Sequence, residues 1–289
     1  MRALILLVPL CGILLFYFTA SGSDNKNEKF AVYYSNKLQG DDFTGYDLLV
    51  LDSRYHPPLK AISEKVPTIL GYISLGEIPQ TAPYFPIFEK SGLLLKENKD
   101  WKGSYSVDIR EPLWQQTVIE EIIPGLLRDG FDGIFIDTLD SPLENERMNP
   151  EDYYGMTDAG AQLVQAIRLH YPKIKIMVNR SYAILPRISS SIDMILGESV
   201  RNTYNFETKL YEPTSEASYN LQVQHLKYAK TLNKDLKVYT LDYADKNDVE
   251  KTAYIYRLQR QNGFIPYVTT IDLTNLTKEP ESVLVGSVK

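Results

Sequence analysis

The chain has 289 residues, of which 44% are hydrophobic and 24% are charged. This composition is that of a globular protein with enough chain for one large domain and a full core, which excludes a disordered chain. The formal net charge of −6 gives a surface that on average repels phosphate backbones and anionic lipid headgroups, so we expect no nucleic acid partner.

The N-terminus has the pattern of an export signal. Arg2 supplies a positive charge, residues 3–18 are an unbroken apolar run, and small residues follow at 19–23. We expect residues 1–22 to be a signal peptide or, because the run approaches the roughly 17–25 residues that span a bilayer, an uncleaved membrane anchor. In either case we expect a protein that is secreted, periplasmic or on the extracellular face of the membrane, with membrane contact only through this segment.

Beyond a polar linker at 23–29, residues 30–289 show no internal break and are predicted to form a single domain. Continuous apolar runs that alternate with amphipathic helices indicate a parallel sheet covered by helices, and about eight such units favour a (β/α)8 TIM barrel of the α/β class. A doubly wound sheet is the alternative, but "YYSNKLQGDD" after the first strand lacks the Gly-rich phosphate turn that it would need. The predicted strands are 30–35, 48–52, 68–77, 133–138, 174–179, 194–198, 238–242 and 265–269, and the main helices are 112–128, 158–170, 217–233 and 247–262.

Polar residues end most of these strands. The C-terminal ends of the strands of a (β/α)8 barrel meet at one mouth, where the chemistry of this fold takes place. Each acid alone is explained equally well by capping the next helix or by pairing with Arg180, but together they predict a carboxylate cluster whose pKa values are pushed apart. The strand-end residues are Asp52, Glu77, Asp137, Asn179 with Arg180, Glu198 and Asp242, and Asp140 follows closely in "IFIDTLD".

Other chemistries fit poorly. Cys11, the one cysteine, lies in the N-terminal segment, and the three histidines have no metal-ligand spacing, so we expect no metal site. Ser74 lacks the glycine of a nucleophile elbow, and the sequence contains neither a Walker loop nor a dinucleotide fingerprint, so no cofactor is expected. A pair of carboxylates that flanks a bond remains, which is what glycoside hydrolysis requires.

Tyrosines give this interpretation weak support. The chain has 21 of them, and several lie near strand ends, where a ring can stack on a sugar face. Most are expected to be packing residues. Those chosen as ligand contacts are Tyr34, Tyr72 and Tyr243.

The strings "YISLGE", "SVDIREPLWQ", "GFDGIFIDTLDS", "VNRS" and "ILGES", in this order, resemble glycoside hydrolase family 114, the endo-α-1,4-polygalactosaminidase-like group that includes the hydrolase domain of Pel-polysaccharide enzymes. The resemblance runs from Phe30 to about Leu276, and the string around Asp137 is its most specific part. It implies a (β/α)8 barrel outside the cytoplasm that cleaves α-1,4-linked galactosamine polymers without a cofactor. It places the catalytic pair on Asp137 and Glu198.

The resemblance agrees with the acid surplus, because a partly deacetylated amino-sugar polymer is cationic and would be attracted to an acidic mouth. We expect Asp137 to be the nucleophile or charge stabiliser and Glu198 the acid/base. A separation of about 5 Å between the two carboxyl groups would indicate that the anomeric configuration is retained, and a separation of about 6.5–9.5 Å would indicate that it is inverted. The expected substrate-binding residues are Tyr34, Asp52, Tyr72, Glu77, Asp140, Asn179, Arg180, Asp242 and Tyr243.

Two other functions remain open at this point. One is a polysaccharide-binding barrel that does not catalyse, since a fold does not fix a function. The other is a hydrolase or transglycosylase for another α-linked glycan, which would use the same residues.

Overall fold

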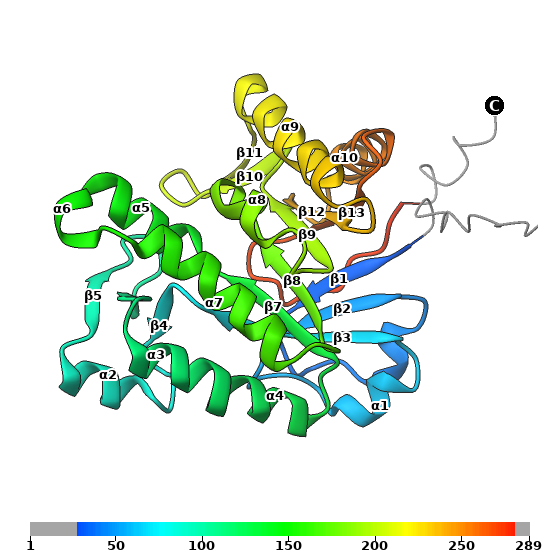
Figure 1. The fold of residues 1–289 in the computed structure, drawn as a ribbon. Coiled ribbons are helices and arrows are strands. Elements are labelled where there is room, and N and C mark those ends of the chain that lie inside the picture. Colours follow the sequence, from blue (N-terminus) through cyan, green and yellow to red (C-terminus); the bar gives the residue numbers. More distant parts are fainter. Residues whose placement is uncertain (1–27, 281–289) are drawn as a thin grey trace, which may run out of the picture.

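The computed structural model describes residues 28–280, and its centre is an eight-stranded parallel sheet with the order β1-β2-β3-β7-β8-β9-β12-β13 (Figure 1). The first and last strands approach each other, since the rings of Phe30 and Tyr267 lie 5.7 Å apart, so the sheet is a nearly closed barrel. The prediction of a (β/α)8 barrel is confirmed. Its strands are β1 (Phe30–Tyr33), β2 (Leu48–Leu51), β3 (Thr68–Ser74), β7 (Gly133–Asp137), β8 (Lys175–Asn179), β9 (Met194–Glu198), β12 (Lys237–Tyr243) and β13 (Ile265–Thr269).

Large apolar side chains fill the interior of the barrel. Phe30 on β1 contacts Tyr239 on β12, which is not its neighbour in the sheet, with ring centroids 4.8 Å apart. Each strand is therefore apolar on both sides, with one face toward the interior and the other toward the helices. This explains the continuous apolar runs in the sequence.

Helices cover the outside of the barrel (Figure 1). The predicted helix at 112–128 is found in three pieces with a π-helical middle, because Pro124 lacks the N–H that a continuous α-helix needs there. The other three predicted helices agree to within about two residues. The covering segments are α1 (Leu59–Ser63), α3 (Pro112–Gln116), η3 (Thr117–Ile122), α4 (Ile123–Asp129), α7 (Met156–His170), η4 (Tyr182–Ile184), α8 (Leu185–Ile188), α9 (Glu216–Leu232) and α10 (Val249–Gln261).

Two units of the barrel depart from the helical pattern. A single 3-10 turn, η2 (Gly40–Phe43), follows β1, and residues 270–280 follow β13 as an irregular segment. This segment lies beside β1, where the Tyr34 backbone N–H donates to the Leu273 carbonyl at 2.7 Å and the Tyr46 hydroxyl donates to the Thr277 carbonyl at 2.9 Å. The segment takes the place of a last helix within the described residues.

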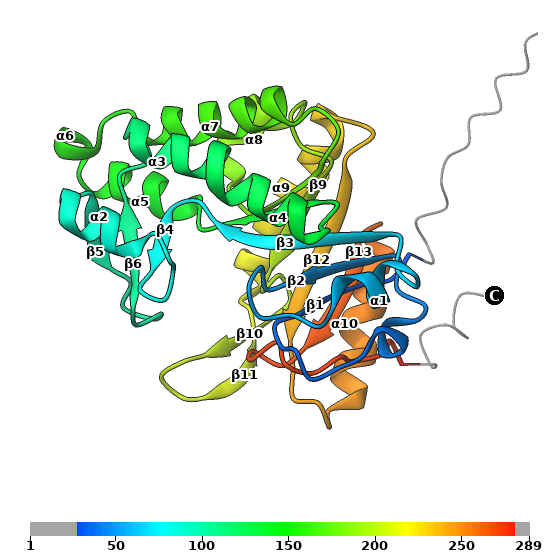
Figure 2. The same cartoon turned by 90° about the horizontal axis from the view of Figure 1, so that it is seen from below.

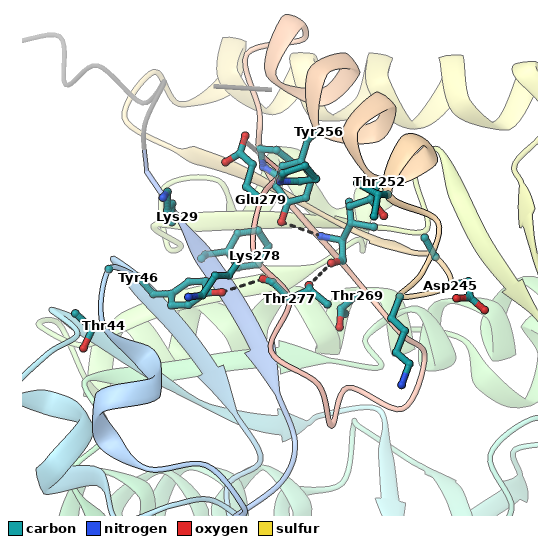
Figure 3. A pocket seen from close by; sticks show the side chains of 18 residues that line it. Lys29, Thr44, Tyr46, Asp245, Thr252, Tyr256, Thr269, Thr277, Lys278 and Glu279 are labelled. Carbon is teal, nitrogen blue, oxygen red and sulfur yellow. Dashed lines mark hydrogen bonds between the residues drawn. The ribbon is translucent and has the colours of Figure 1, made fainter. Parts of the chain in front are cut away.

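A cavity of about 670 Å³ lies between this segment and α10 (Figure 3). Tyr46, Tyr256, Thr277 and Lys278 are among the residues that line it. None of the predicted site residues does so. The cavity is therefore separate from the mouth of the barrel that the sequence indicated.

The insertions that shape the mouth were not predicted, and all follow C-terminal ends of barrel strands. Figure 2 shows that the β4–β6 sheet and the β10–β11 hairpin project from the same end of the barrel. This end is the one at which the site residues lie. The insertions are β4 (Glu77–Pro79), α2 (Phe85–Ser91), β5 (Leu94–Glu97) and β6 (Ser104–Val107) after β3, α5 (Asp140–Met148) and α6 (Pro150–Tyr153) after β7, and β10 (Asn202–Asn205) with β11 (Leu210–Pro213) after β9.

The prediction that Glu77 ends a barrel strand is wrong. Strand β3 ends at Ser74, and Glu77 begins β4 in a separate antiparallel sheet. The chain turns out of the barrel at Gly76, where a Cβ would lie only 2.0 Å from the Thr138 carbonyl oxygen. Only glycine allows this close approach, and the turn breaks the long apolar run into two elements.

The predicted signal or anchor at residues 1–22, with Cys11, lies outside the described residues, as does most of the predicted linker. Between residues 28 and 280, no helix is both long and apolar enough to cross a membrane.

Candidate active site

One amide nitrogen joins the two carboxylates that were predicted to be catalytic. Asn179 Nδ2 donates to Asp137 Oδ1 at 2.9 Å and to Glu198 Oε2 at 2.7 Å. The three residues end the neighbouring strands β7, β8 and β9, so the barrel itself brings them together. The two bond lengths limit the distance between these carboxylate oxygens to at most 5.6 Å.

Two tyrosines hold the other oxygens of the pair. The Tyr72 hydroxyl donates to Asp137 Oδ2 at 3.0 Å, and the Tyr243 hydroxyl donates to Glu198 Oε1 at 2.6 Å. Each carboxylate is thus fixed by one tyrosine and by the shared amide. Such fixed partners hold a reacting group in one orientation before substrate binds.

Tyr34 completes this tyrosine cluster. Its ring packs edge-on against Tyr72, with centroids 5.4 Å apart. Burial first, and then the charges of Asp137, Glu198 and Asp52, raise the pKa of Tyr34 well above its usual value. The Tyr34 hydroxyl is therefore neutral at any physiological pH.

The two carboxylates influence each other's charge. Burial, and next the charge of Glu198, raise the pKa of Asp137 to about 6, although hydrogen bonds from Asn179, the Thr138 backbone and Tyr72 oppose the rise. A carboxyl group with this pKa is mostly ionised at pH 7 and is half protonated near pH 6. The pair therefore takes up a proton under mildly acidic conditions.

The backbone is strained directly after Asp137, Asn179 and Glu198, the three residues joined by the shared amide. Thr138, Arg180, Ser181 and Ser199 all have left-handed conformations, with φ between 50° and 62°. Such conformations are costly for residues other than glycine, and they cluster at functional sites. The backbone therefore changes direction immediately after each of the three site residues.

Thr138 also has a side-chain role that the sequence reasoning missed. Its hydroxyl donates to the Asp137 backbone carbonyl at 2.8 Å, accepts from the Gly76 N–H at 2.9 Å and pairs with the Ser74 hydroxyl at 2.7 Å. The Thr in "FIDT" thereby fixes the turn that presents Asp137. A hydroxyl directly after a strand-end acid is the signal that could have indicated it.

Arg180, Asp140 and Asp52 lie around the pair. Arg180 donates through Nη2 and Nε to the Glu198 backbone carbonyl at 2.9 and 3.2 Å. Asp140 is exposed and lies within electrostatic range of Arg180 and Glu198. Asp52 is partly exposed and accepts from the Arg54 and Tyr55 N–H groups at 2.8 and 2.7 Å. These three predicted residues are at the mouth.

Glu77 and Asp242 are not at the mouth surface, and their prediction as substrate contacts is corrected. Glu77 is 4% exposed and its carboxylate accepts from Asn98, Ser104 and Ser141. Asp242 is 0% exposed. It precedes Tyr243 on β12 and so faces the opposite side of the sheet.

The oxygens of Asp242 accept from the backbone N–H groups of Arg201 and Asn202 at 2.6 and 2.9 Å, and from Gln259 Nε2 at 3.1 Å. Burial raises the pKa of Asp242 to about 6, and the hydrogen bonds lower it. Glu77 therefore stabilises the insertion after β3, and Asp242 stabilises the start of the β10–β11 hairpin, so neither is free to bind a ligand. Position at a strand end alone could not distinguish these roles.

Among residues 28–280, no group of three His, Cys, Asp or Glu side chains is arranged to hold a metal ion. The oxygens of the central pair instead have an amide and two hydroxyls as partners. This arrangement suits proton transfer and covalent chemistry by carboxylates.

Known proteins resemble this chain over most of its length. The profile of glycoside-hydrolase family GH114 matches residues 19–285. An uncharacterized protein of Deinococcus radiodurans is 24% identical over 216 residues, which are 72% of this chain and 66%, slightly less than two thirds, of that relative.

Two solved structures share the fold. The glycoside hydrolase domain of PelA from Pseudomonas aeruginosa superposes with a TM-score of 0.75 at 19% identity, covering 87% of this chain and 98% of that domain. Ega3 of Aspergillus fumigatus, in complex with galactosamine, gives a TM-score of 0.65 at 15% identity, covering 88% and 95% of the two chains. With the profile match to nearly the whole chain, the conclusion is that this protein belongs to glycoside-hydrolase family GH114 and is a glycoside hydrolase.

Proposed function

We propose that this glycoside hydrolase cleaves an α-1,4-linked, galactosamine-containing polysaccharide of the Pel or galactosaminogalactan type with retention of configuration, using Asp137 as nucleophile and Glu198 as acid/base. The observation that carries the proposal is the shared hydrogen bond of Asn179, which limits two carboxylate oxygens to a separation of at most 5.6 Å. Retaining enzymes place their carboxyl groups about 5–5.5 Å apart, and inverting enzymes need about 6.5–9.5 Å to admit a water.

The first chemical step forms a covalent intermediate. Asp137 attacks the anomeric carbon and forms an ester, while Glu198 gives its proton to the glycosidic oxygen and the leaving sugar departs as an alcohol. In the second step Glu198 takes a proton from water, whose oxygen attacks the same carbon and releases Asp137 as a carboxylate. The first step needs one proton on the pair, held by Glu198 while Asp137 is ionised, and the raised pKa of Asp137 reflects how poorly the buried site tolerates two charges.

Asn179 fits both steps because the negative charge moves between its two partners. Asp137 carries the charge before attack, and Glu198 carries it once the ester has formed. An amide nitrogen that donates to both oxygens, at 2.9 and 2.7 Å, can stabilise either state without moving. Tyr72 and Tyr243 keep the outer oxygens in place during the exchange.

The charge of the mouth supports a cationic substrate. Asp52, Asp140, Asp137 and Glu198 surround it, and Arg180 is the basic residue of the predicted set. A polymer with free amino groups would be drawn to this surface, and a neutral glucan would not. The bound galactosamine of Ega3 supports the same substrate class.

Product analysis tests the substrate. The purified protein should release fragments from a partly de-N-acetylated α-1,4-galactosamine polymer and none from a neutral α-1,4-glucan. Asp137→Asn and Glu198→Gln, which keep the shape of each side chain, serve as controls and should bind the polymer without cleaving it. Cleavage of the glucan alone would reject the amino-sugar proposal, and elongated products would indicate transglycosylation.

We also propose that residues 1–22 direct the protein out of the cytoplasm. The positive start, the apolar run and the small residues that follow support this. Mass spectrometry of the protein from a cell fraction outside the cytoplasm should give a mature N-terminus near residues 21–24. The full-length mass in a membrane fraction would indicate an anchor instead.

A further inference from the structure

Two exposed aromatic rings touch each other at the catalytic end of the barrel. Trp101 is 55% exposed and Phe206 is 43% exposed, and their ring centroids lie 5.4 Å apart with an interplanar angle of 74°. Trp101 lies in the turn between β5 and β6, and Phe206 lies in the turn of the β10–β11 hairpin. Both insertions extend from the end of the barrel that carries Asp137 and Glu198 (Figure 2). Two exposed aromatic rings in contact with each other at this end of the barrel offer a flat apolar surface on which a sugar ring can stack.

The turn that carries Trp101 is rigidly anchored. Asn98 Oδ1 accepts from the backbone N–H groups of Asp100 and Trp101 at 3.0 and 3.2 Å, and Asn98 Nδ2 donates to Glu77 at 3.0 Å. Ser104, which follows the turn, donates its hydroxyl to Glu77 at 2.7 Å. The buried Glu77 therefore fixes both sides of the turn.

The hairpin that carries Phe206 is fixed at its tip and at its base. Asn205 Oδ1 accepts from the N–H groups of Glu207 and Thr208 at 2.9 and 3.1 Å, and the rings of Tyr204 and Phe206 lie 5.2 Å apart. At the base, Asp242 accepts from the N–H groups that begin the hairpin. Both rings are thus held in place by the two buried acids that hold no ligand themselves.

We propose that Trp101 and Phe206 form a remote stacking subsite for one pyranose unit of the polysaccharide, beyond the sugars held by the catalytic pair. The proposal rests on the proposed function, because it takes the occupant to be the same polymer strand. The two insertions follow β3 and β9, which carry Tyr72 and Glu198, so the rings lie at the same end of the barrel as the catalytic pair.

The chemistry of the rings fits an amino sugar. The C–H face of a pyranose is apolar and can cover an exposed ring, while its hydroxyls remain in water. A protonated amino group is attracted to the face of a tryptophan. Asp100 and Glu207 lie next to the two rings, but the exposed Lys99, Lys102 and Lys209 lie in the same turns, so the subsite depends on the rings and not on the local charge.

A remote subsite binds long substrates and is out of reach of short ones. The test compares kcat/KM on an α-1,4-galactosamine polymer with kcat/KM on the shortest oligomer that the parent cleaves, for Trp101→Ala, Phe206→Ala and the double variant. Each single variant should lower the ratio of the two values by on the order of tenfold, which corresponds to about 1.4 kcal/mol. The double variant should lose little more than a single one, because the two rings act as one surface.

Tyr228→Ala is the matched control, since Tyr228 is 47% exposed on α9 and belongs to neither insertion. It should keep the ratio of the parent. A parental ratio in both Trp101→Ala and Phe206→Ala, or a ratio that rises because the rings obstruct the mouth, would overturn the subsite. If the parent cleaves no amino-sugar polymer at all, the proposed function fails instead, so the two failures are distinguishable.

Discussion

Asp137 and Glu198 share a single hydrogen-bond donor, the side-chain nitrogen of Asn179, at 2.9 and 2.7 Å. Two partly buried carboxylates this close repel each other, and the shared donor offsets part of that repulsion. The same bridge sets the separation that our mechanism needs. Predictions about charge, stability and stereochemistry follow from it.

The bridge itself can be removed. In Asn179→Ala the two carboxylates lose the donor that aligns them, so we expect kcat to fall by about 10²-fold, as for removal of one preorganised donor. The measurement is steady-state kinetics on the polymer. Asn205→Ala, which alters an amide outside the pair, should retain the kcat of the parent on the shortest substrate within a few-fold. Parental kcat in Asn179→Ala would show that the bridge has no catalytic part.

The Tyr72 hydroxyl is one of the groups that lower the pKa of Asp137, the proposed nucleophile. Because the pKa of Asp137 is raised to about 6, kcat/KM should fall as the pH drops through about 6. The Tyr72 hydroxyl lowers this pKa, so Tyr72→Phe should move the acid limb of the profile to higher pH. Tyr84→Phe, which alters a tyrosine with no hydrogen bond to the pair, should leave the limb in place. A limb that moves to lower pH in Tyr72→Phe would contradict the assignment.

Asp137 should cost stability at neutral pH. Its folded-state pKa of about 6 lies above the ordinary value of 3.8 for this side chain, so its ionisation destabilises the fold, increasingly from about pH 4 to pH 6 and fully above that. Asp137→Asn should therefore raise the free energy of unfolding at pH 7.5 by up to about 3 kcal/mol, and the gain should shrink toward zero near pH 4. Thermal unfolding at both pH values checks this. An equal loss of stability at both would mean that the carboxylate is structurally required.

Glu77 should matter for folding rather than for substrate contact. Glu77→Ala leaves the donors of Asn98, Ser104 and Ser141 without their acceptor, which we expect to cost about 2–4 kcal/mol of folding stability. Asp52→Ala, at the partly exposed mouth, should change stability by less than about 1 kcal/mol. Denaturant unfolding of both variants measures the difference. Equal stabilities would return Glu77 to the ligand-binding set.

The barrel and the meeting of its strand-end residues at one mouth were accessible from the sequence because local patterns encode them, whereas the choice of Asp137 and Glu198 as the catalytic pair came from the resemblance to glycoside hydrolase family 114. Each barrel strand is a continuous apolar run, and Asp137 stands where such a run meets polar residues. Parallel strands bring their ends together, so Asp137, Asn179 and Glu198 could be placed in one mouth before any coordinates were known.

The remaining errors come from contacts between distant segments. The position of Glu77 depends on the approach of Gly76 to Thr138, which no local pattern reveals. Asp242 resembles the other strand-end acids, but it stands one residue before Tyr243 and therefore faces the opposite side of the sheet. The contact between Trp101 and Phe206 joins two insertions that the sequence did not predict at all.

The anomeric configuration of the first product tests the central claim most directly. Proton NMR, recorded immediately after the enzyme is mixed with a soluble α-1,4-galactosamine oligomer, distinguishes the two anomers before they equilibrate. A pair held within 5.6 Å by Asn179 predicts that the α-anomer forms first, through a covalent intermediate on Asp137. If the β-anomer forms first, a water attacks in place of Asp137, and the retaining mechanism is wrong.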